Sequence, residues 1–315
     1  MTIIYTNVKI AYKKFQLTGE IMKERILQLS ISPEMNGQTV RYILKNEFHM
    51  ASTLISRLKG RPDGICLNHI KVYTNATVQS GDLLTINVTD IDPFNPAEPR
   101  PFFLDIKYED DDLVIINKPA GIAVHGSDRI ESPTIANAFS YHYGRNQSFH
   151  PVNRLDKGTS GLMVLAKNAY VHDRLRRLMH TEMFQREYLA ITEDVINPPD
   201  GLIEKPISKR PVSGIRRVID PNGLPSSTKY LTLKVNNDHS LVSVTPITGR
   251  THQIRLHFSS VGYPLVGDPI YGSRSMIIDR PALHSHKVHI VHPILNSEID
   301  ITESMPADMQ TLVYE

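Results

Sequence analysis

Residues 154–166 read Arg-Leu-Asp-Lys-Gly-Thr-Ser-Gly-Leu-Met-Val-Leu-Ala. The first eight residues predict a polar turn, and the five apolar residues after them predict a buried strand. Side chains alternate between the two faces of an extended segment, so we expect Arg154 and Asp156 to share a face. An arginine keeps a neighbouring carboxylate ionised and oriented, as a nucleophilic or charge-stabilising aspartate requires. A simple ion pair at a strand end is the alternative, and these residues alone do not exclude it.

The composition is typical of a soluble globular protein with two domains. The chain has 315 residues, 40% apolar and 22% charged, and a formal net charge of +2. Cys66 is the only cysteine, which excludes an intrachain disulfide and a cysteine-based zinc cluster and fits a reducing, cytoplasmic location. No apolar run is long enough to cross a membrane, and residues 1–24 do not resemble a secretory signal. We expect a monomer without a membrane partner.

The chain divides into four segments by pattern. Residues 1–27 have no clean period and are expected to form an N-terminal arm without assigned structure. Residues 28–90 predict a small unit in which two short helices, starting near Thr39 and Ser52, are followed by short strands. Four prolines mark residues 91–104 as a stiff linker. Residues 105–315 predict an α+β domain with a mainly antiparallel sheet and flanking helices.

The charge of the small unit is one-sided. The segment between Thr39 and Pro62 contains five Lys and Arg residues but a single acidic residue, Glu47. A solvated helical face is the ordinary explanation for such a run. However, the helix pair, the basic face and the strands around Asn68 and Gly81-Asp82 together resemble the S-four-type (alpha-L) RNA-binding domain. This resemblance implies a basic helical face that lies on an RNA backbone.

Three further segments of the large domain contain candidate site residues. In the segment 108–121, Lys118 precedes a turn and could contact a phosphate or remain solvated. Tyr188 begins a predicted strand, where a ring could stack on a base, although most such tyrosines are core residues. Arg250 follows Gly249 at an expected strand-to-helix turn and could pair with Asp156. Arg255 is expected to point elsewhere, as a structural or RNA-facing residue.

Taken in order, the segments 108–121, 154–167, 186–191 and 249–272 resemble the motifs of the RluA/RluD-type RNA pseudouridine synthases. With the small unit in front, the resemblance covers about residues 30–310. It implies that Asp156 is the catalytic aspartate, Tyr188 the active-site tyrosine and Arg250 the partner of the aspartate. It also implies that Arg154 contacts RNA near a flipped base. The chain departs from the usual family pattern at Asn153, where His is usual, and at Gly158, where an acid is common.

The resemblance implies an isomerase that converts uridine to pseudouridine in RNA, without a metal or an organic cofactor. Large-subunit ribosomal RNA is the expected substrate and transfer RNA the alternative. A non-catalytic RNA-binding or ribosome-assembly protein on the same scaffold is the main competing function, and a glycosidase would need two positioned acids. The candidate residues are Asp156, Tyr188 and Arg250 for catalysis, and Arg154, Arg41, Lys45, Arg57, Lys59, Arg61 and Lys118 for RNA binding.

A histidine-rich segment near the C-terminus could instead indicate a metal site. His284 and His286 would share a strand face, as zinc ligands do, and His289 and His292 follow. No cysteine or acid accompanies them at a characteristic spacing. Since residues 283–287 also resemble the last motif of the family, we expect no metal site here.

Overall fold

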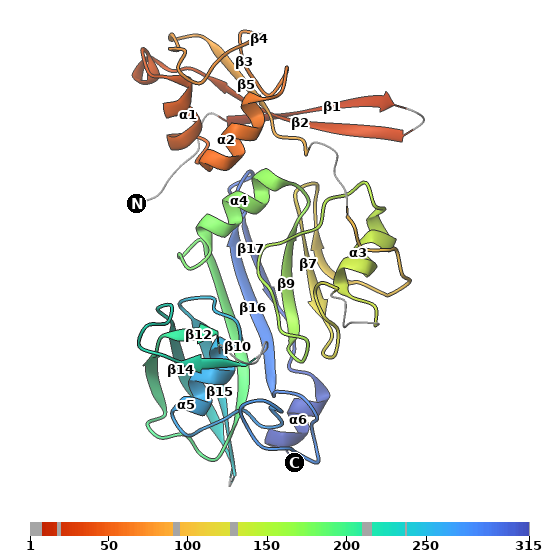
Figure 1. The fold of residues 1–315 in the computed structure, drawn as a ribbon, viewed down its shortest axis with the longest axis vertical. Coiled ribbons are helices and arrows are strands. Elements are labelled where there is room, and N and C mark those ends of the chain that lie inside the picture. Colours follow the sequence, from red (N-terminus) through yellow and green to blue (C-terminus); the bar gives the residue numbers. More distant parts are fainter. Residues whose placement is uncertain are drawn as a thin grey trace.

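A computed structural model describes residues 8–17, 20–90, 95–126, 132–209, 216–236 and 238–314, with side chains from residue 24 onward. The described chain forms two units, one above the other in Figure 1. Strands and helices are mixed without a regular βαβ repeat, which confirms the expected α+β class. Among the described residues, no helix combines the length and the apolar character needed to span a bilayer.

The N-terminal unit is a five-stranded sheet with two helices. Its strand order is β1-β2-β5-β3-β4, and all its pairings are antiparallel. The sequence predicts an unassigned arm over residues 1–27, whereas β1 and β2 form a hairpin there, and β2 crosses the expected boundary at residue 28. The elements are β1 (Val8–Leu17), β2 (Glu20–Ser30), η1 (Pro33–Met35), α1 (Val40–Asn46), α2 (Ser52–Lys59), β3 (Ile65–Leu67), β4 (Ile70–Lys71) and β5 (Leu83–Asn87).

Both helices of this unit form where the apolar spacing predicts them. The Thr39 side chain caps α1 by accepting a hydrogen bond from the Tyr42 amide, and α1 buries Val40, Ile43 and Leu44. For the second helix the sequence predicts Ser52 as the N-cap, but Ala51 occupies that position, without a capping side chain, and Ser52 is the first helical residue. The buried stripes of the two helices cover the sheet, which leaves their basic residues outside.

The large unit is built on a ten-stranded sheet. Its order is β11-β14-β15-β10-β16-β9-β7-β6, with β17 beside β16 and β8 beside β9. The pairing of β16 with β9 is parallel and the others are antiparallel, as expected for a mainly antiparallel sheet. These strands are β6 (Asp105–Glu109), β7 (Leu113–Lys118), β8 (His150–Pro151), β9 (Ser160–Ala166), β10 (Phe184–Glu193), β11 (Asp200–Glu204), β14 (Ser227–Val235), β15 (His239–Pro246), β16 (Leu283–Val291) and β17 (Glu298–Thr302).

Within the described part of the large unit, four helices flank this sheet, and a small separate sheet pairs β12 (Ile207–Lys209) with β13 (Arg217–Ile219). The helices are α3 (Ile135–Tyr143), α4 (Ala169–Leu178), α5 (Gln253–Ser260) and α6 (Ala307–Tyr314). Apolar residues at helical spacing predict helices over residues 169–179 and 251–261, which are α4 and α5, whereas no helix is predicted at α3 or α6. The strand β9 is buried along its whole length, as its unbroken apolar run predicts.

The two units share an apolar core. Leu27 and Leu29 of β2 belong to the same buried cluster as Leu113 and Val164 of the large sheet. Of the expected stiff linker, residues 91–94 lie outside the described residues, but Asn95 is buried and bonded to the backbone of Ala136 at 3.0 Å. The N-terminal unit is therefore docked on the large unit through buried surface.

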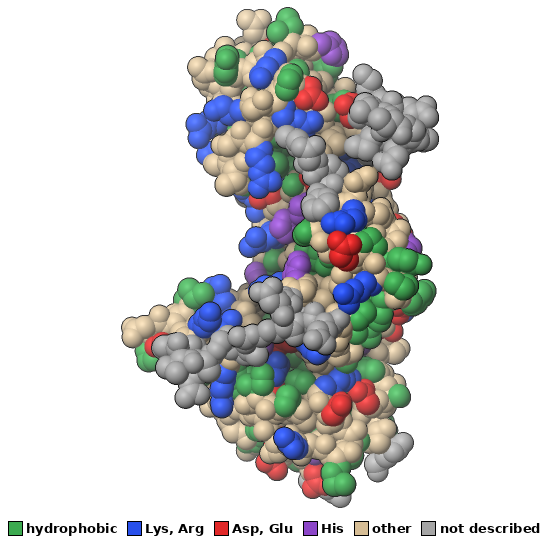
Figure 2. Space-filling view, turned by 45° about the vertical axis from the view of Figure 1, so that its right-hand side comes forward, with side chains coloured by type: hydrophobic (Ala, Val, Ile, Leu, Met, Phe, Trp, Pro, Cys, Tyr) green, Lys and Arg blue, Asp and Glu red, His purple; other side chains and the backbone are tan. Residues whose placement is uncertain are grey.

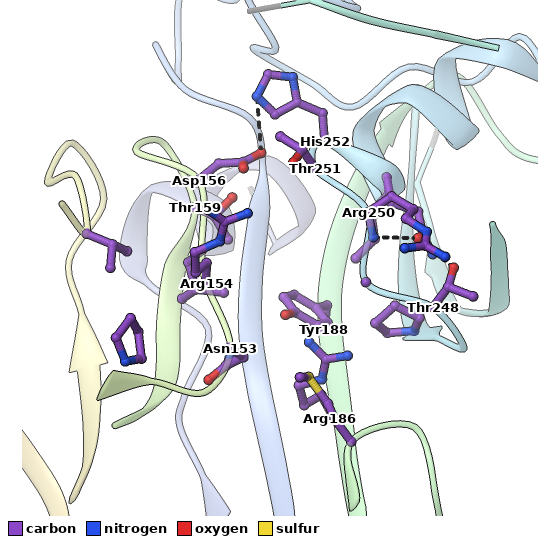
Figure 3. A pocket seen from close by; sticks show the side chains of 18 of the residues that line it. Asn153, Arg154, Asp156, Thr159, Arg186, Tyr188, Thr248, Arg250, Thr251 and His252 are labelled. Atoms are coloured by element: carbon purple, nitrogen blue, oxygen red, sulfur yellow. Dashed lines mark hydrogen bonds and ion pairs between the residues drawn. The ribbon is translucent and has the colours of Figure 1, made fainter. Parts of the chain in front are cut away.

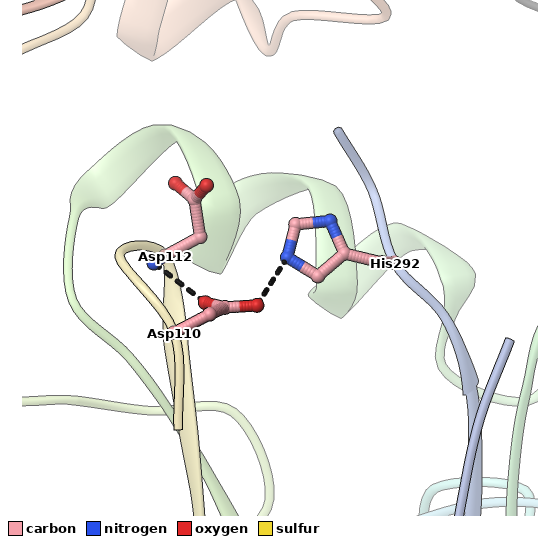
Figure 4. A group of neighbouring side chains, drawn as sticks. All are labelled: Asp110, Asp112 and His292. Atoms are coloured by element: carbon pink, nitrogen blue, oxygen red, sulfur yellow. Dashed lines mark hydrogen bonds and ion pairs between the residues drawn. The ribbon is translucent and has the colours of Figure 1, made fainter. Parts of the chain in front are cut away.

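A buried group of charges lies at this joint (Figure 4). Nδ1 of His292 accepts hydrogen bonds from the amides of Ile294 and Leu295, so its proton is on Nε2, 3.0 Å from Asp110. Burial alone would raise the pKa of Asp110, but the hydrogen bond from His292 helps to lower it below its usual value. Asp112 pairs with Arg25 of β2 at 2.8 Å. The atoms that could bind a metal are thus already engaged by protein groups, and the cluster connects the units.

Replacing Arg25 tests this joint. Arg25→Met would leave Asp112 buried without its cation, so we expect a loss of about 3–5 kcal/mol in the free energy of unfolding. The double variant Arg25→Met/Asp112→Leu should recover most of that loss, because it removes both charges. Lys107→Met, which breaks a more exposed pair with Glu303, should cost no more than about 1 kcal/mol. Urea denaturation measures all three, and equal losses for Arg25→Met and Lys107→Met would contradict the assignment.

Candidate active site

A pocket of about 920 Å³ opens on one side of the large sheet. Its walls come from the loop before β9, from β10, from α4 and the loop after it, and from the turn between β15 and α5 (Figure 3). Arg154 and Asp156 both line this pocket, as their shared face predicts. Tyr188 and Arg250 line it as well, so the structure brings together all three residues predicted to be catalytic.

The predicted partner of the aspartate is wrong. Nη1 of Arg255 donates to Oδ2 of Asp156 at 3.0 Å. Arg250 lies on the opposite side of the pocket, where its Nε donates to the carbonyl of Pro225 at 3.2 Å (Figure 3). The Asp156 side chain keeps 25% of its surface exposed, while that of Arg255 keeps 5%. The carboxylate therefore faces the pocket and the cation that holds it lies behind.

A second carboxylate fixes Arg255. Asp268 accepts two parallel hydrogen bonds from this guanidinium, from Nε at 2.6 Å and from Nη2 at 2.8 Å. Burial would raise the pKa of Asp268, but the hydrogen bonds and charge of Arg255 lower it below the ordinary value. Two carboxylates likewise raise the pKa of Arg255 in spite of its burial. Both groups remain charged at neutral pH, so Asp156 lies beside a permanent cation.

The start of α5 explains why the sequence points to the wrong arginine. The helix begins at Gln253, and the side chain of Gln253 accepts a hydrogen bond from the Arg250 amide at 2.9 Å. Arg250 therefore belongs to the turn, while Arg255 belongs to the first turn of a helix that is buried on all sides through Phe258. Asp268 was the residue of the sequence that could have identified Arg255 as the buried arginine. A buried arginine needs an acidic partner, and Asp268 follows 13 residues later.

His252 follows Arg250 in the turn before α5, where a general base and a packed histidine are the two roles that the sequence allows, and it is packed and also faces the aspartate. It occupies the left-handed region with φ of 58° directly before α5. Its Nδ1 lies 3.1 Å from the Tyr271 hydroxyl, and its Nε2 lies 3.9 Å from Oδ2 of Asp156 (Figure 3). Burial lowers the pKa of His252, which keeps the ring neutral near pH 7. A neutral ring at that separation does not replace Arg255 as the charge partner.

Tyr188 lies beside an irregularity of the neighbouring strand. The partner of Glu187 is Lys287 and that of Tyr188 is Ser285, so the extra residue of the bulge belongs to β16 and the strand β10 runs on without a break. Arg186, two residues earlier, is on the same face and also lines the pocket. The ring of Tyr188 is 5% exposed, so it forms part of the pocket wall.

Lys118 is not a phosphate contact. Its side chain is fully buried, and its ammonium donates to the carbonyls of Pro119 and Ile122 at 2.8 and 2.9 Å. A third contact, at 3.4 Å, reaches the carbonyl of Lys157, directly after Asp156. Burial lowers the pKa of Lys118 to about 7. The lysine joins two loops beneath the site, where RNA cannot reach it.

The two departures from the family pattern have structural explanations. The Asn153 side chain accepts a hydrogen bond from the Val164 amide at 2.8 Å and so holds the loop against β9. A Cβ at Gly158 would lie 2.8 Å from Cδ of Pro281, which leaves no room for an acidic side chain. Neither residue contacts Asp156 through a hydrogen bond or an ion pair in the described chain.

The basic residues predicted in the N-terminal unit divide into two groups. Arg41, Lys45, Arg57 and Lys59 are exposed on the helices, and Figure 2 shows Lys and Arg side chains over that unit. Arg61 instead donates to the carbonyls of Asn87 at 3.1 Å and Thr89 at 2.7 Å. We therefore correct its assignment from RNA binding to holding the end of β5.

The histidines near the C-terminus do not converge. His284 contacts the Ser160 hydroxyl at 2.9 Å, while His289 contacts Asp300 at 2.8 Å. His286 and His292 have yet other partners, the carbonyl of Glu303 and Asp110. The four histidines thus have four separate sets of contacts, which fit individually hydrogen-bonded side chains and not a shared ion.

Comparisons with known proteins agree with this geometry. Residues 112–260 match the family model described as RNA pseudouridylate synthase. The chain is 36% identical over 295 residues to the uncharacterized RNA pseudouridine synthase YhcT of Bacillus subtilis, covering 92% of this chain and 97% of that one. It is 34% identical over 253 residues to ribosomal large subunit pseudouridine synthase D of Escherichia coli, covering 75% and 77%. The structure of human RNA pseudouridylate synthase domain containing 4 superposes with a TM-score of 0.53 at 26% identity, covering 65% of this chain and 91% of that one.

The buried pair of Arg255 and Asp268 predicts a specific dependence of stability on pH. Asp268→Asn should cost on the order of 3 kcal/mol at pH 7, because a buried guanidinium loses a carboxylate. The folded-state pKa of Asp268 is depressed, so its contribution is complete above the unfolded value of about 3.9 and is lost as pH falls through the folded value. Urea midpoints should show a constant gap between wild type and variant from about pH 7 to pH 5, and a narrower gap at pH 3. A gap that widens in acid would refute this.

Proposed function

Because this chain belongs to the RluA/RluD-type RNA pseudouridine synthases, we propose that it isomerises uridines of large-subunit ribosomal RNA with Asp156 as its catalytic group. The enzyme class follows from the family. The ribosomal target is supported by relatives named for that RNA, and transfer RNA is the alternative. Mapping of pseudouridines in cells that lack the protein identifies the uridine, and an unchanged ribosomal RNA would refute the target.

The residues that line the pocket match the requirements of the reaction. The reaction breaks the bond between N1 and C1′ of uridine, turns the base, and joins C5 to C1′. The C5 proton is lost and N1 gains one, so the reaction involves no net oxidation or reduction. Asp156 supplies an ionised carboxylate at the pocket surface, and Arg255 holds it in place. The residues of the pocket are compatible with attack by Asp156 on C1′ or C6 and with abstraction of the 2′ proton. We therefore assign Asp156 as the catalytic group but do not assign the atom with which it reacts.

The pocket also fits a base taken out of its stack. Unstacking a nucleotide costs a few kcal/mol, and single-stranded loops lower that cost. Tyr188 offers an aromatic face for the detached base within reach of the loop that carries Asp156. Arg154 and Arg250 are exposed at the pocket, where they are suited to contact the flanking phosphates.

Two competing functions are less compatible with the site. A non-catalytic RNA-binding protein has no need for an arginine held between two carboxylates behind an open pocket. A glycosidase needs a second acid that can give up a proton. Asp268 is the nearby acid, but it is fully buried and its two oxygens are bonded to Arg255. It is therefore unavailable to a substrate.

We assign the N-terminal unit to RNA binding of the S-four (alpha-L) type. Its support is the exposed basic side of α1 and α2, and its contribution is affinity and choice of site. Under this proposal the enzyme acts as a monomer in the cytoplasm. It takes RNA as its partner and uses no cofactor.

Substitutions at three residues test the catalytic assignment. Asp156→Asn should abolish isomerisation while RNA affinity stays within a few fold, because the amide keeps the shape and loses the charge. Arg255→Lys should lower kcat about 100-fold through displacement of Asp156. Arg250→Gln should mainly raise KM. Tritium release from uridine-labelled RNA measures each, and turnover by Asp156→Asn or a larger kcat loss in Arg250→Gln than in Arg255→Lys would overturn the assignment.

Tyr188 has a ring and a hydroxyl whose roles can be separated. If the ring alone supports the base, Tyr188→Phe retains most activity and Tyr188→Leu loses it, since only Leu lacks an aromatic face. If the hydroxyl takes part in proton transfer, both variants lose kcat. Single-turnover assays at saturating RNA distinguish these outcomes. Full activity in both variants would remove Tyr188 from the site.

A further inference from the structure

The helix α4 forms a wall of the pocket on the side nearest the N-terminal unit. His172 and Arg176 are four residues apart on this helix, and both line the pocket. After the helix, the ring of His180 packs beside Gly249, where a Cβ would lie 3.4 Å from it. Nδ1 of His180 lies 3.4 Å from Nη2 of Arg186. The lining between the site of the base and the last turn of α4 thus carries the charges of Arg186 and Arg176. The two histidines add polar surface but no charge at neutral pH, because burial lowers the pKa of His180 and lowers that of His172 to about 4.

The other side of α4 contacts the N-terminal unit directly. Asp173 accepts a hydrogen bond from the Ala51 amide at 3.0 Å and pairs with Arg177 at 3.3 Å. The Tyr170 hydroxyl donates to the carbonyl of Phe48 at 3.3 Å. Burial and the nearby charges of Arg174 and Arg177 lower the pKa of His49. The last turn of α4 is therefore adjacent to the segment that joins α1 to α2.

The basic surface continues on α1. Arg41 and Lys45 are four residues apart, exposed, and on the same face of this helix. The acidic residue of α4, Asp173, is already bonded to Ala51 and Arg177, so its negative charge is partly neutralised. Figure 2 shows Lys and Arg side chains on the N-terminal unit, and further Lys, Arg and His side chains in the hollow below it. Basic side chains are therefore visible from one direction both on the N-terminal unit and in the hollow beneath it (Figure 2).

From this arrangement we propose that α4 carries the RNA between the pocket and the N-terminal unit. Arg176, which lines the pocket, and Arg177, whose side chain stays 46% exposed in its pair with Asp173, would bind phosphates on one flank of the target uridine. The proposal rests on the RNA-modifying function argued above. A ten-residue helix is about 15 Å long, which corresponds to roughly four stacked nucleotides. Arg41 and Lys45 would then hold the nucleotides beyond that flank.

Charge removal on α4 tests the path. The probe is unmodified, in vitro transcribed large-subunit ribosomal RNA, and the measurement is the dependence of binding on salt. Each phosphate contact to a single strand contributes about 0.7 to the slope of log K against log salt. Arg176→Gln/Arg177→Gln should therefore flatten the slope by about 1.4, and Arg41→Gln/Lys45→Gln by a similar amount. The matched control Lys229→Gln/Lys234→Gln, at exposed positions of β14, removes the same charge and should leave the slope and the activity unchanged.

A second measurement locates the contacts. Fragments of the same RNA are trimmed from either end toward the uridine that the wild-type enzyme converts. The difference in affinity between wild type and the α4 variant should disappear when one flank is trimmed and persist when the other is. A slope change no larger than that of the β14 control, or a difference that survives trimming of both flanks, would overturn the proposal. A wild-type protein that binds the RNA with the expected slopes but forms no pseudouridine would refute the proposed function and leave the path standing.

Discussion

The arrangement of the active site depends on one buried cation. Arg255 lies between Asp156, which faces the pocket, and Asp268, which is fully buried. Taking a guanidinium out of water is costly, and only good hydrogen-bond geometry with both acids compensates for it. The interaction therefore fixes three segments at once: the loop before β9, the first turn of α5 and the loop that contains Asp268. Displacement of any of these segments would leave a buried charge without its partner.

The large sheet places the other half of the pocket. Tyr188 comes from β10, a central strand whose register shifts at that residue, while Asp156 comes from the loop that precedes β9. The strand β16 lies between these two strands in the sheet, so the tyrosine and the aspartate face each other across it. Rigid strands hold both residues, which suits a reaction that must retain a detached base while it turns.

The docking of the N-terminal unit has a consequence for substrate choice. A shared apolar core and the pair of Arg25 with Asp112 fix the direction in which α1 and α2 present their charges. A basic unit on a mobile tether would raise affinity for many RNAs alike. If this unit binds RNA as proposed, its docked position favours those RNAs whose shape places a uridine in the pocket and a backbone along α4.

The sequence by itself determined the α+β class and the helices α1, α2, α4 and α5, because apolar periodicity and turn residues act over short distances. Its alternation also placed Arg154 and Asp156 on one face, whereas the presence of Tyr188 in the same pocket was implied only by the resemblance to a family. It could not show which arginine reaches Asp156, since the start of α5 depends on the contact of Gln253 with the backbone of Arg250. Nor could it show that Lys118 and Arg61 are occupied by backbone carbonyls, or that residues 8–17 pair with β2. The sequence specifies the type and charge of each residue. The burial of a side chain and the identity of its hydrogen-bond and ion-pair partners depend on how distant segments pack, so only the tertiary structure decided them.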